Sequence, residues 1–148
     1  MHQRAGSNSL SVMKLINLDH VAIAVTDLDR AVEGYQARYR VLPLYREVIE
    51  NQGVEEVMIA LGGSFIQLLQ PLGADTPVGK FLQRRGEGLH HVAYTVASIT
   101  AALDHLRDQG ARLIDETPRI GGRGAKIAFV HPEDLGGTLI ELVELDDG

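Results

Sequence analysis

The sequence predicts an α+β domain built from two repeated halves, each with a first strand, a helix and further strands. Two internal repeats carry this prediction. The stretch LDHVAIAVTDLDRAV at 18–32 aligns with LHHVAYTVASITAAL at 89–103, and GGSFIQLLQ at 62–70 aligns with GGTLIELVE at 136–144. Self-similarity of this kind is the signature of a fold made from copied units, so we expect a pseudo-twofold architecture.

The first half opens with a strand and a helix. DHVAIAV alternates with period two, as a strand with one buried face does. Thr26 and Asp27 follow it and are good N-cap residues for the helical stretch LDRAVEGYQARY. VEEVMIAL is the expected middle strand, and it leads through a Gly-Gly pair to the repeated final strand.

A short helix is expected between the halves. It begins at Thr76-Pro77, with proline at the first helical position, and ends at Gly86. In the second half, HHVAYTV is followed by Ser98 as the N-cap of a helix that stops at Gly110, a residue suited to the C′ position. AKIAFV supplies the middle strand of this half.

Composition narrows the class of protein. The 148 residues are 45% hydrophobic, which is enough for one sizeable core, and the net charge of −6 argues against a nucleic-acid partner. No apolar run approaches the roughly 20 residues that cross a bilayer, so we expect no membrane partner and a cytoplasmic protein. Residues 1–14 have no signal-peptide core and are interpreted as a disordered leader or expression remnant. Without cysteine, any metal must be held by nitrogen and oxygen ligands.

Strand parity places one histidine of each half on a face that has room for a ligand. Successive side chains of a strand point to opposite sides of the sheet. His20, Ala22 and Ala24 therefore share one face, opposite the larger apolar residues that suit packing under the helix. His91 occupies the equivalent place in the second half, next to Ala93 on the same face.

The repeated final strands add Gln67 in one copy and Glu141 in the other. Two imidazoles, an amide oxygen and a carboxylate suit a divalent ion, with positions left for water or substrate. A lone strand histidine is ordinarily a hydrogen-bonded structural residue, but two at equivalent places favour metal binding. His90 is expected to point away from His91. The four histidines read as structural are His2, His90, His105 and His131.

Over most of its length the sequence resembles the vicinal oxygen chelate superfamily and, within it, the methylmalonyl-CoA epimerase family. The match runs from about Ile16 to Glu144 and depends on DHVAIAV, ENQGVEEVMIAL, IQLLQPL, KFLQRRGEGLHHVAY and IAFVHPEDLGGTLIELVE. It implies paired βαβββ modules that form a cupped eight-stranded mixed sheet around a metal site. The modules would span about 16–72 and 87–145, within a single domain of residues 15–148.

The resemblance also implies an activity and a site. The family interconverts (2R)- and (2S)-methylmalonyl-CoA by removing a proton from the α-carbon and returning one on the opposite face, through an enolate that a metal stabilises. Carried over position by position, the metal ligands fall on His20, Gln67, His91 and Glu141. Glu56 and Glu141 fall on the two acid/base positions. Glu56 shares the strand parity of Met58 and Ala60, so it can face the same cup, although without the resemblance a solvated strand-end glutamate would be favoured.

The implied cofactor is a divalent ion, Co²⁺ in the first place, with Mn²⁺, Ni²⁺, Zn²⁺ or Mg²⁺ as alternatives. The implied partners are an acyl-CoA substrate and a second copy of the chain in a homodimer. Cations that could meet the CoA phosphates, each also readable as solvated surface charge, are Lys80, Arg84, Arg85, Arg119, Arg123 and Lys126.

Two other functions stay open at the level of sequence. A glyoxalase-type lyase uses the same fold and metal on a glutathione hemithioacetal, but many such relatives carry Glu where Gln67 stands. A metal-free binding module of this fold would normally lack four intact ligands. The segment LYREVIENQGV departs from the family pattern at Tyr45 and Arg46, which leaves the preference for methylmalonyl-CoA over ethylmalonyl-CoA open.

Overall fold

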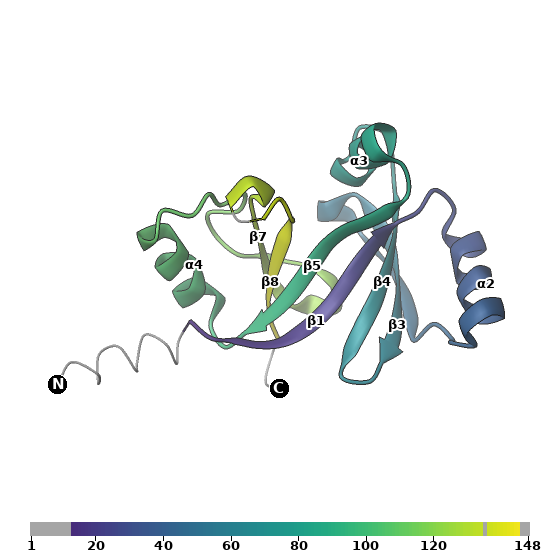
Figure 1. Cartoon of the computed structure of the whole chain (residues 1–148), viewed down its shortest axis with the longest axis horizontal. Coiled ribbons are helices and arrows are strands. Elements are labelled where there is room, and N and C mark those ends of the chain that lie inside the picture. Colours follow the sequence, from purple (N-terminus) through teal and green to yellow (C-terminus); the bar gives the residue numbers. More distant parts are fainter. Residues whose placement is uncertain (1–12, 135, 146–148) are drawn as a thin grey trace. The chain divides into compact units, whose positions relative to one another are not determined.

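The structure, a computed structural model, describes residues 13–134 and 136–145 (Figure 1). The predicted order of strand, helix and three strands occurs twice, with one helix between the copies. The first copy comprises β1 (Leu15–Ala24), α2 (Leu28–Tyr39), β2 (Tyr45–Ile49), β3 (Val54–Leu61) and β4 (Ser64–Pro71). The linking helix is α3 (Pro77–Arg85). The second copy comprises β5 (Gly88–Val96), α4 (Ile99–Asp108), β6 (Arg119–Ile120), β7 (Lys126–Val130) and β8 (Ile140–Glu144).

The eight strands follow the order β2-β3-β4-β1-β5-β8-β7-β6. β1 runs parallel to β4 and β5 runs parallel to β8, whereas the outer strands pair antiparallel. The predicted α+β fold with an eight-stranded mixed sheet is therefore confirmed. None of the helices among the described residues is long and apolar enough to cross a bilayer.

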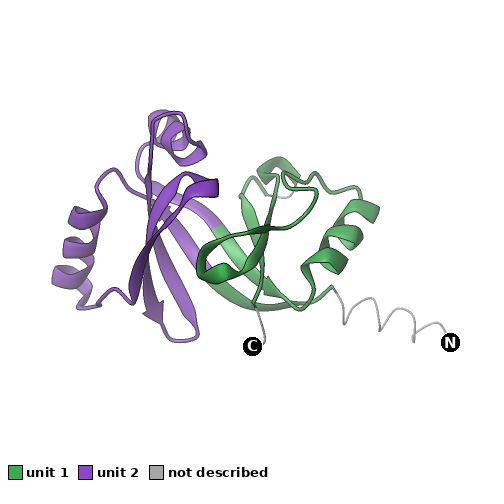
Figure 2. Cartoon of the chain, turned by 180° about the vertical axis from the view of Figure 1, so that it is seen from behind, with its two compact units in different colours: residues 1–19, 92–148 green, residues 20–91 purple. Residues whose placement is uncertain are grey.

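The chain divides into two compact units, residues 20–91 and residues 1–19 with 92–148 (Figure 2). The boundary passes through β1 and β5, so each of these strands contributes residues to both units. The predicted leader, residues 1–14, lies outside the described residues except for its last two.

The unit of residues 20–91 carries a helix on each face of its strands. Ile23 and Val25 pack with Leu68 under α2, as strand parity predicts. On the other face, Ala22 and Ala24 pack with Val78 of α3. This second cluster covers one end of that face and leaves its other end to polar side chains.

In the unit of residues 1–19 and 92–148, a helix again packs on one face of the strands. Val96 and Leu142 pack with Leu103 under α4. The opposite face carries a smaller cluster that includes Ala93 and Phe129.

The helix ends confirm most of the predicted caps. Asp27 caps α2 by accepting a hydrogen bond from Arg30 N, and Ser98 caps α4 by accepting one from Ala101 N. Thr76 caps α3, which has proline in its first turn as predicted. Thr26 is not the cap; its backbone N and its hydroxyl instead donate to the carboxylate of Glu87.

A second capping contact recurs in both copies. The side chain of Gln70, at the end of β4, accepts from the first helical amide of α2, Leu28 N, at 2.7 Å. Glu144, at the end of β8, accepts from Ile99 N of α4, also at 2.7 Å. Because these amides have no partner within their own helices, the repeated final strand stabilises the start of the helix in each copy.

We predict that Gly79→Ala lowers the free energy of unfolding by about 1–3 kcal/mol, because α3 packs closely on the loop before it. A methyl group at Gly79 would meet the carbonyl oxygens of Gly73 at 2.3 Å and Ala74 at 2.8 Å. Both are backbone atoms, so α3 itself has to move. Denaturant unfolding measures the loss.

Gly34→Ala, in the middle of α2, is the matched control. The nearest atom to its new methyl is the flexible end of Arg38 at 3.7 Å, so better helix propensity should stabilise the protein by roughly 0.5–1 kcal/mol. Equal stability of Gly79→Ala and the wild type would show that α3 is not packed as described.

Candidate functional site

The paired histidines of the repeats meet at their Nε2 atoms. His20 on β1 and His91 on β5 are 3% and 2% exposed, and their Nε2 atoms are 3.2 Å apart. The two rings meet edge to face, with centroids 5.3 Å apart. Two nitrogen ligands about 2.1 Å from one ion lie about 3.0 Å apart at a right angle and about 3.4 Å apart at a tetrahedral angle. The observed separation therefore suits two neighbouring ligands of a single ion.

Gln67 offers an oxygen on the same face as His20. It lies on β4 opposite Ala22, two residues along β1 from His20. Its Nε2 donates to Glu56 Oε1 at 2.5 Å. Gln67 Oε1 is buried and has no hydrogen-bond partner among the described residues. A buried amide oxygen without a donor is costly unless it binds something, so this atom fits a cation.

Glu56 is buried, and the interpretation of a solvated strand-end glutamate is wrong. Its side chain is 1% exposed on β3, while the neighbouring Glu55 points to the other face and pairs with Arg46 at 2.8 Å. Burial, followed by a hydrogen bond with Glu47, raises the pKa of the Glu56 carboxyl to about 7, against the lowering effect of the Gln67 amide and His20. Such a carboxyl can both take and return a proton near neutral pH.

Glu141 belongs to the other compact unit, where it lies on β8 and is 4% exposed. Its neighbours across the sheet are Ala93 on β5 and Phe129 on β7. Residues that pair directly across two strands share a face, so Glu141 lies on the same face as buried Ala93.

Two residues near the site were not predicted. His90 was expected to point away from His91, but its Nδ1 lies 2.9 Å from His91 Nδ1. Glu47 on β2 is the cross-strand partner of Glu56 and contributes to its raised pKa. The HH dipeptide was a visible signal for His90, whereas the Glu47 contact depends on a strand register that the sequence does not reveal.

The remaining histidines agree with their structural readings where the structure describes them. His105 lies on α4, and His131 accepts a hydrogen bond from Glu133 N in the turn after β7. His2 lies outside the described residues.

The candidate CoA-binding cations divide into two groups. Lys80, Arg84 and Arg85 of α3 are exposed. The three around β6 and β7 form ion pairs: Arg119 with Asp115 at 3.3 Å, Arg123 with buried Asp19 at 2.6 Å, and Lys126 with Glu144 at 3.8 Å.

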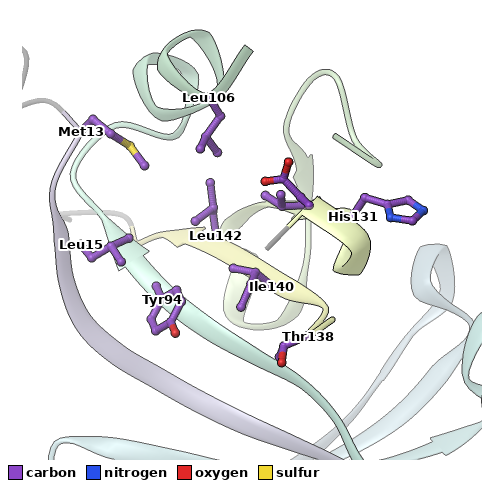
Figure 3. A pocket seen from close by; sticks show the side chains of 10 residues that line it. Met13, Leu15, Tyr94, Leu106, His131, Thr138, Ile140 and Leu142 are labelled. Atoms are coloured by element: carbon purple, nitrogen blue, oxygen red, sulfur yellow. The ribbon is translucent and has the colours of Figure 1, made fainter. Parts of the chain in front are cut away.

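A separate pocket of about 170 Å³ lies in the unit that carries Glu141 (Figure 3). Its lining includes Tyr94, Ile140 and Leu142, which alternate with Ala93 and Glu141 along their strands. The pocket therefore opens on the α4 face of the sheet, away from Glu141. Its lining is mostly apolar and includes none of the proposed metal ligands.

Comparison with known proteins assigns the chain to a family. A model of the glyoxalase/bleomycin resistance protein/dioxygenase superfamily matches residues 19–129. Human mitochondrial methylmalonyl-CoA epimerase is 38% identical over 133 residues, which cover 89% of this chain and 76% of that protein. The ethylmalonyl-CoA/methylmalonyl-CoA epimerase of Cereibacter sphaeroides is 38% identical over 130 residues, covering 86% and 97%.

A solved structure gives the same result. A variant of Streptomyces coelicolor methylmalonyl-CoA epimerase in complex with 2-nitronate-propionyl-CoA is 41% identical, with a TM-score of 0.88 over 90% of this chain and 97% of that one. The chain therefore belongs to the glyoxalase/bleomycin resistance protein/dioxygenase superfamily and, within it, to the methylmalonyl-CoA epimerase family. Members of that family are isomerases, and the predicted family and enzyme class are confirmed.

Proposed function

We propose that this protein interconverts the (2R) and (2S) epimers of methylmalonyl-CoA. The proposal depends mainly on the buried Glu56, whose pKa is raised to about 7. Glu56 accepts a hydrogen bond from the amide nitrogen of Gln67, whose oxygen has no donor among the described residues. A group in this state suits reversible removal of a weakly acidic proton from carbon. The names of the similar enzymes, and the acyl-CoA analogue bound to one of them, support the substrate class.

We propose that one divalent ion is held by His20, Gln67, His91 and Glu141. All four are buried, and the Nε2 separation of the histidines and the unpartnered Gln67 oxygen fit an ion. Glu141 would supply the only charge of the ligand set. When bound, the ion would act as a Lewis acid toward the thioester oxygen. Co²⁺ is the proposed ion, and Mn²⁺, Ni²⁺, Zn²⁺ and Mg²⁺ are the alternatives.

The two carboxylates have different proposed tasks. Glu56 would take and return the substrate proton, while its Oε1 accepts a hydrogen bond from the Gln67 amide. Glu141 would exchange the proton on the opposite side of the planar intermediate. We further propose that residues 15–148 form a single domain. We also propose a cytoplasmic location.

The test of the function is turnover of methylmalonyl-CoA by the purified protein, compared with ethylmalonyl-CoA and with a glutathione hemithioacetal. Epimerisation of methylmalonyl-CoA with no lyase activity supports the proposal. Lyase activity without epimerisation would replace it with the glyoxalase-type function. Absence of both activities and of bound metal would favour the binding module.

We predict that His91→Ala abolishes metal retention and epimerisation together, because it removes one of the two neighbouring nitrogen ligands. Metal content after mild purification, with circular dichroism as the check of folding, measures the effect. His131→Ala is the matched control, because His131 lies in a turn and should leave metal content unchanged. A folded His91→Ala protein with normal metal content would contradict the assignment of His91 as a ligand.

We predict that Glu56→Gln lowers the epimerisation rate about 10²–10⁴-fold with metal content unchanged, because it removes one acid/base group and no ligand. In heavy water the variant should still exchange the α-proton for deuterium in the epimer whose α-proton faces Glu141, without inverting the configuration of the α-carbon. Glu141→Gln should lose metal affinity as well as activity.

Glu55→Gln serves as the control for Glu56→Gln, because Glu55 is the adjacent residue on the opposite face of β3. It should epimerise at the wild-type rate. If Glu56→Gln also keeps the wild-type rate at saturating metal, Glu56 is not the base.

We predict a homodimer. The first part of β1 exposes Leu15, Ile16 and Leu18 at 43–49% of their surface, which association of two chains would cover. Sedimentation at micromolar concentration should give twice the chain mass of 16.1 kDa. A monomer under those conditions would refute the prediction.

A further inference from the structure

We infer that His90 is a positioning residue, which orients the ring of His91 and fixes the position of its proton for metal binding. The inference rests on the metal site under "Proposed function". It concerns contacts that lie wholly within residues 20–91.

The two ring nitrogens of His91 have different neighbours. Its Nε2 lies 3.2 Å from His20 Nε2, and its Nδ1 lies 2.9 Å from His90 Nδ1. A neutral imidazole has one N–H and one lone pair, and a ligand nitrogen must offer the lone pair. If Nε2 of His91 binds the ion, its Nδ1 must carry the proton and donate it to His90.

This requirement also defines the state of His90. To accept from His91, His90 must present the lone pair of Nδ1, so its own proton lies on Nε2. The reversed arrangement, in which His90 donates to His91, would put the His91 proton on Nε2 and block the ligand position. The 2.9 Å contact suits either direction of donation, and only the form in which His91 donates leaves the lone pair of its Nε2 to an ion. Hydrogen bonds to the second nitrogen of a histidine ligand are a common way to hold its orientation.

His90 is itself held in place by α3. Its ring meets Phe81 edge to face, with centroids 4.9 Å apart and planes at 75°. The guanidinium of Arg85 lies 5.9 Å from the centre of the same Phe81 ring. Consecutive strand residues ordinarily point to opposite faces, so the inward turn of the His90 ring needs such a support. Packing on Phe81 explains the position of the His90 ring. It does not explain why the ring atom next to His91 Nδ1 is a nitrogen.

Three variants separate the hydrogen bond from the packing. His90→Asn puts an oxygen near the position of Nδ1 and keeps the acceptor without the ring. His90→Gln carries its oxygen one bond further and misplaces the acceptor. His90→Phe keeps a ring against Phe81 and has no acceptor. Competition with a chelating dye then measures Zn²⁺ and Co²⁺ affinity for each variant and the wild type.

We expect Zn²⁺ affinity to fall about 10–100-fold in His90→Phe and His90→Gln and to stay within a few-fold of wild type in His90→Asn. The opposite order, with His90→Phe close to wild type and His90→Asn weak, would show that only ring packing matters and would overturn the inference. If His90→Phe does not fold, the comparison of His90→Asn with His90→Gln decides, because neither has a ring.

Nitrogen-15 NMR of the histidine rings gives a readout that needs no metal. In the metal-free wild type, the His91 proton should lie on Nδ1, and in His90→Phe it should be distributed over both nitrogens. An unchanged His91 spectrum in His90→Phe would overturn the positioning role. Failure of the wild type to bind metal would instead overturn the proposed metal site, while the NMR result still decides whether His90 directs the proton of His91.

Discussion

The hydrogen bond from the Gln67 amide to Glu56 links a proposed ligand to a proposed base, and the rest of the site depends on it. An amide that donates through its nitrogen presents its oxygen to the other side, and here that oxygen is buried without a donor. A carboxylate at position 67 would accept rather than donate, and it would face Glu56 with a like charge. The pair therefore explains why this copy of the repeat carries glutamine.

The second copy shows the complementary change. Glu141 pairs across the sheet with Phe129, as Gln67 pairs with Met58. Two residues before Phe129, at the place that corresponds to Glu56, stands Ile127, which is buried in an apolar cluster. Glu141 therefore has no acidic neighbour at that position. The two copies of the repeat differ together at two places, with glutamine and glutamate in the first copy and glutamate and isoleucine in the second.

The repeated final strand serves both faces of the sheet in each copy. Along β4, Gln67 faces the site, Leu68 enters the core under α2, and Gln70 caps the start of that helix. β8 uses Glu141, Leu142 and Glu144 in the same way with α4. Alternation forces this division, because residues one and three places beyond a ligand both point to the helix side. In each copy, the same final strand therefore sets both the position of the helix and the position of the proposed ligand.

Features that depend on local pattern could be predicted from the sequence, and features that depend on register could not. The faces of His20 and His91 follow from period-two alternation, and the caps at Asp27 and Ser98 follow from residue type. The burial of Glu56 does not, because Glu55 and Glu56 differ only in parity, and the local sequence alone does not say which face is covered. The contact between His90 and His91 was also not predicted, because consecutive side chains of a strand were expected to point to opposite faces.

The state of Glu56 follows from a balance between opposing effects. Burial disfavours its charged form, and the adjacent Glu47 carboxyl adds to this effect through a hydrogen bond that exists only while one of the two holds a proton. The hydrogen bond from Gln67, and to a smaller extent the neighbouring His20, favour the ionised form, and the result is a pKa of about 7. Burial without Gln67 would raise the pKa further, and exposure would lower it toward the value of an ordinary glutamate. In the proposed two-base reaction, each group removes a proton in one direction and returns it in the reverse direction, and a carboxyl in this intermediate state can do both.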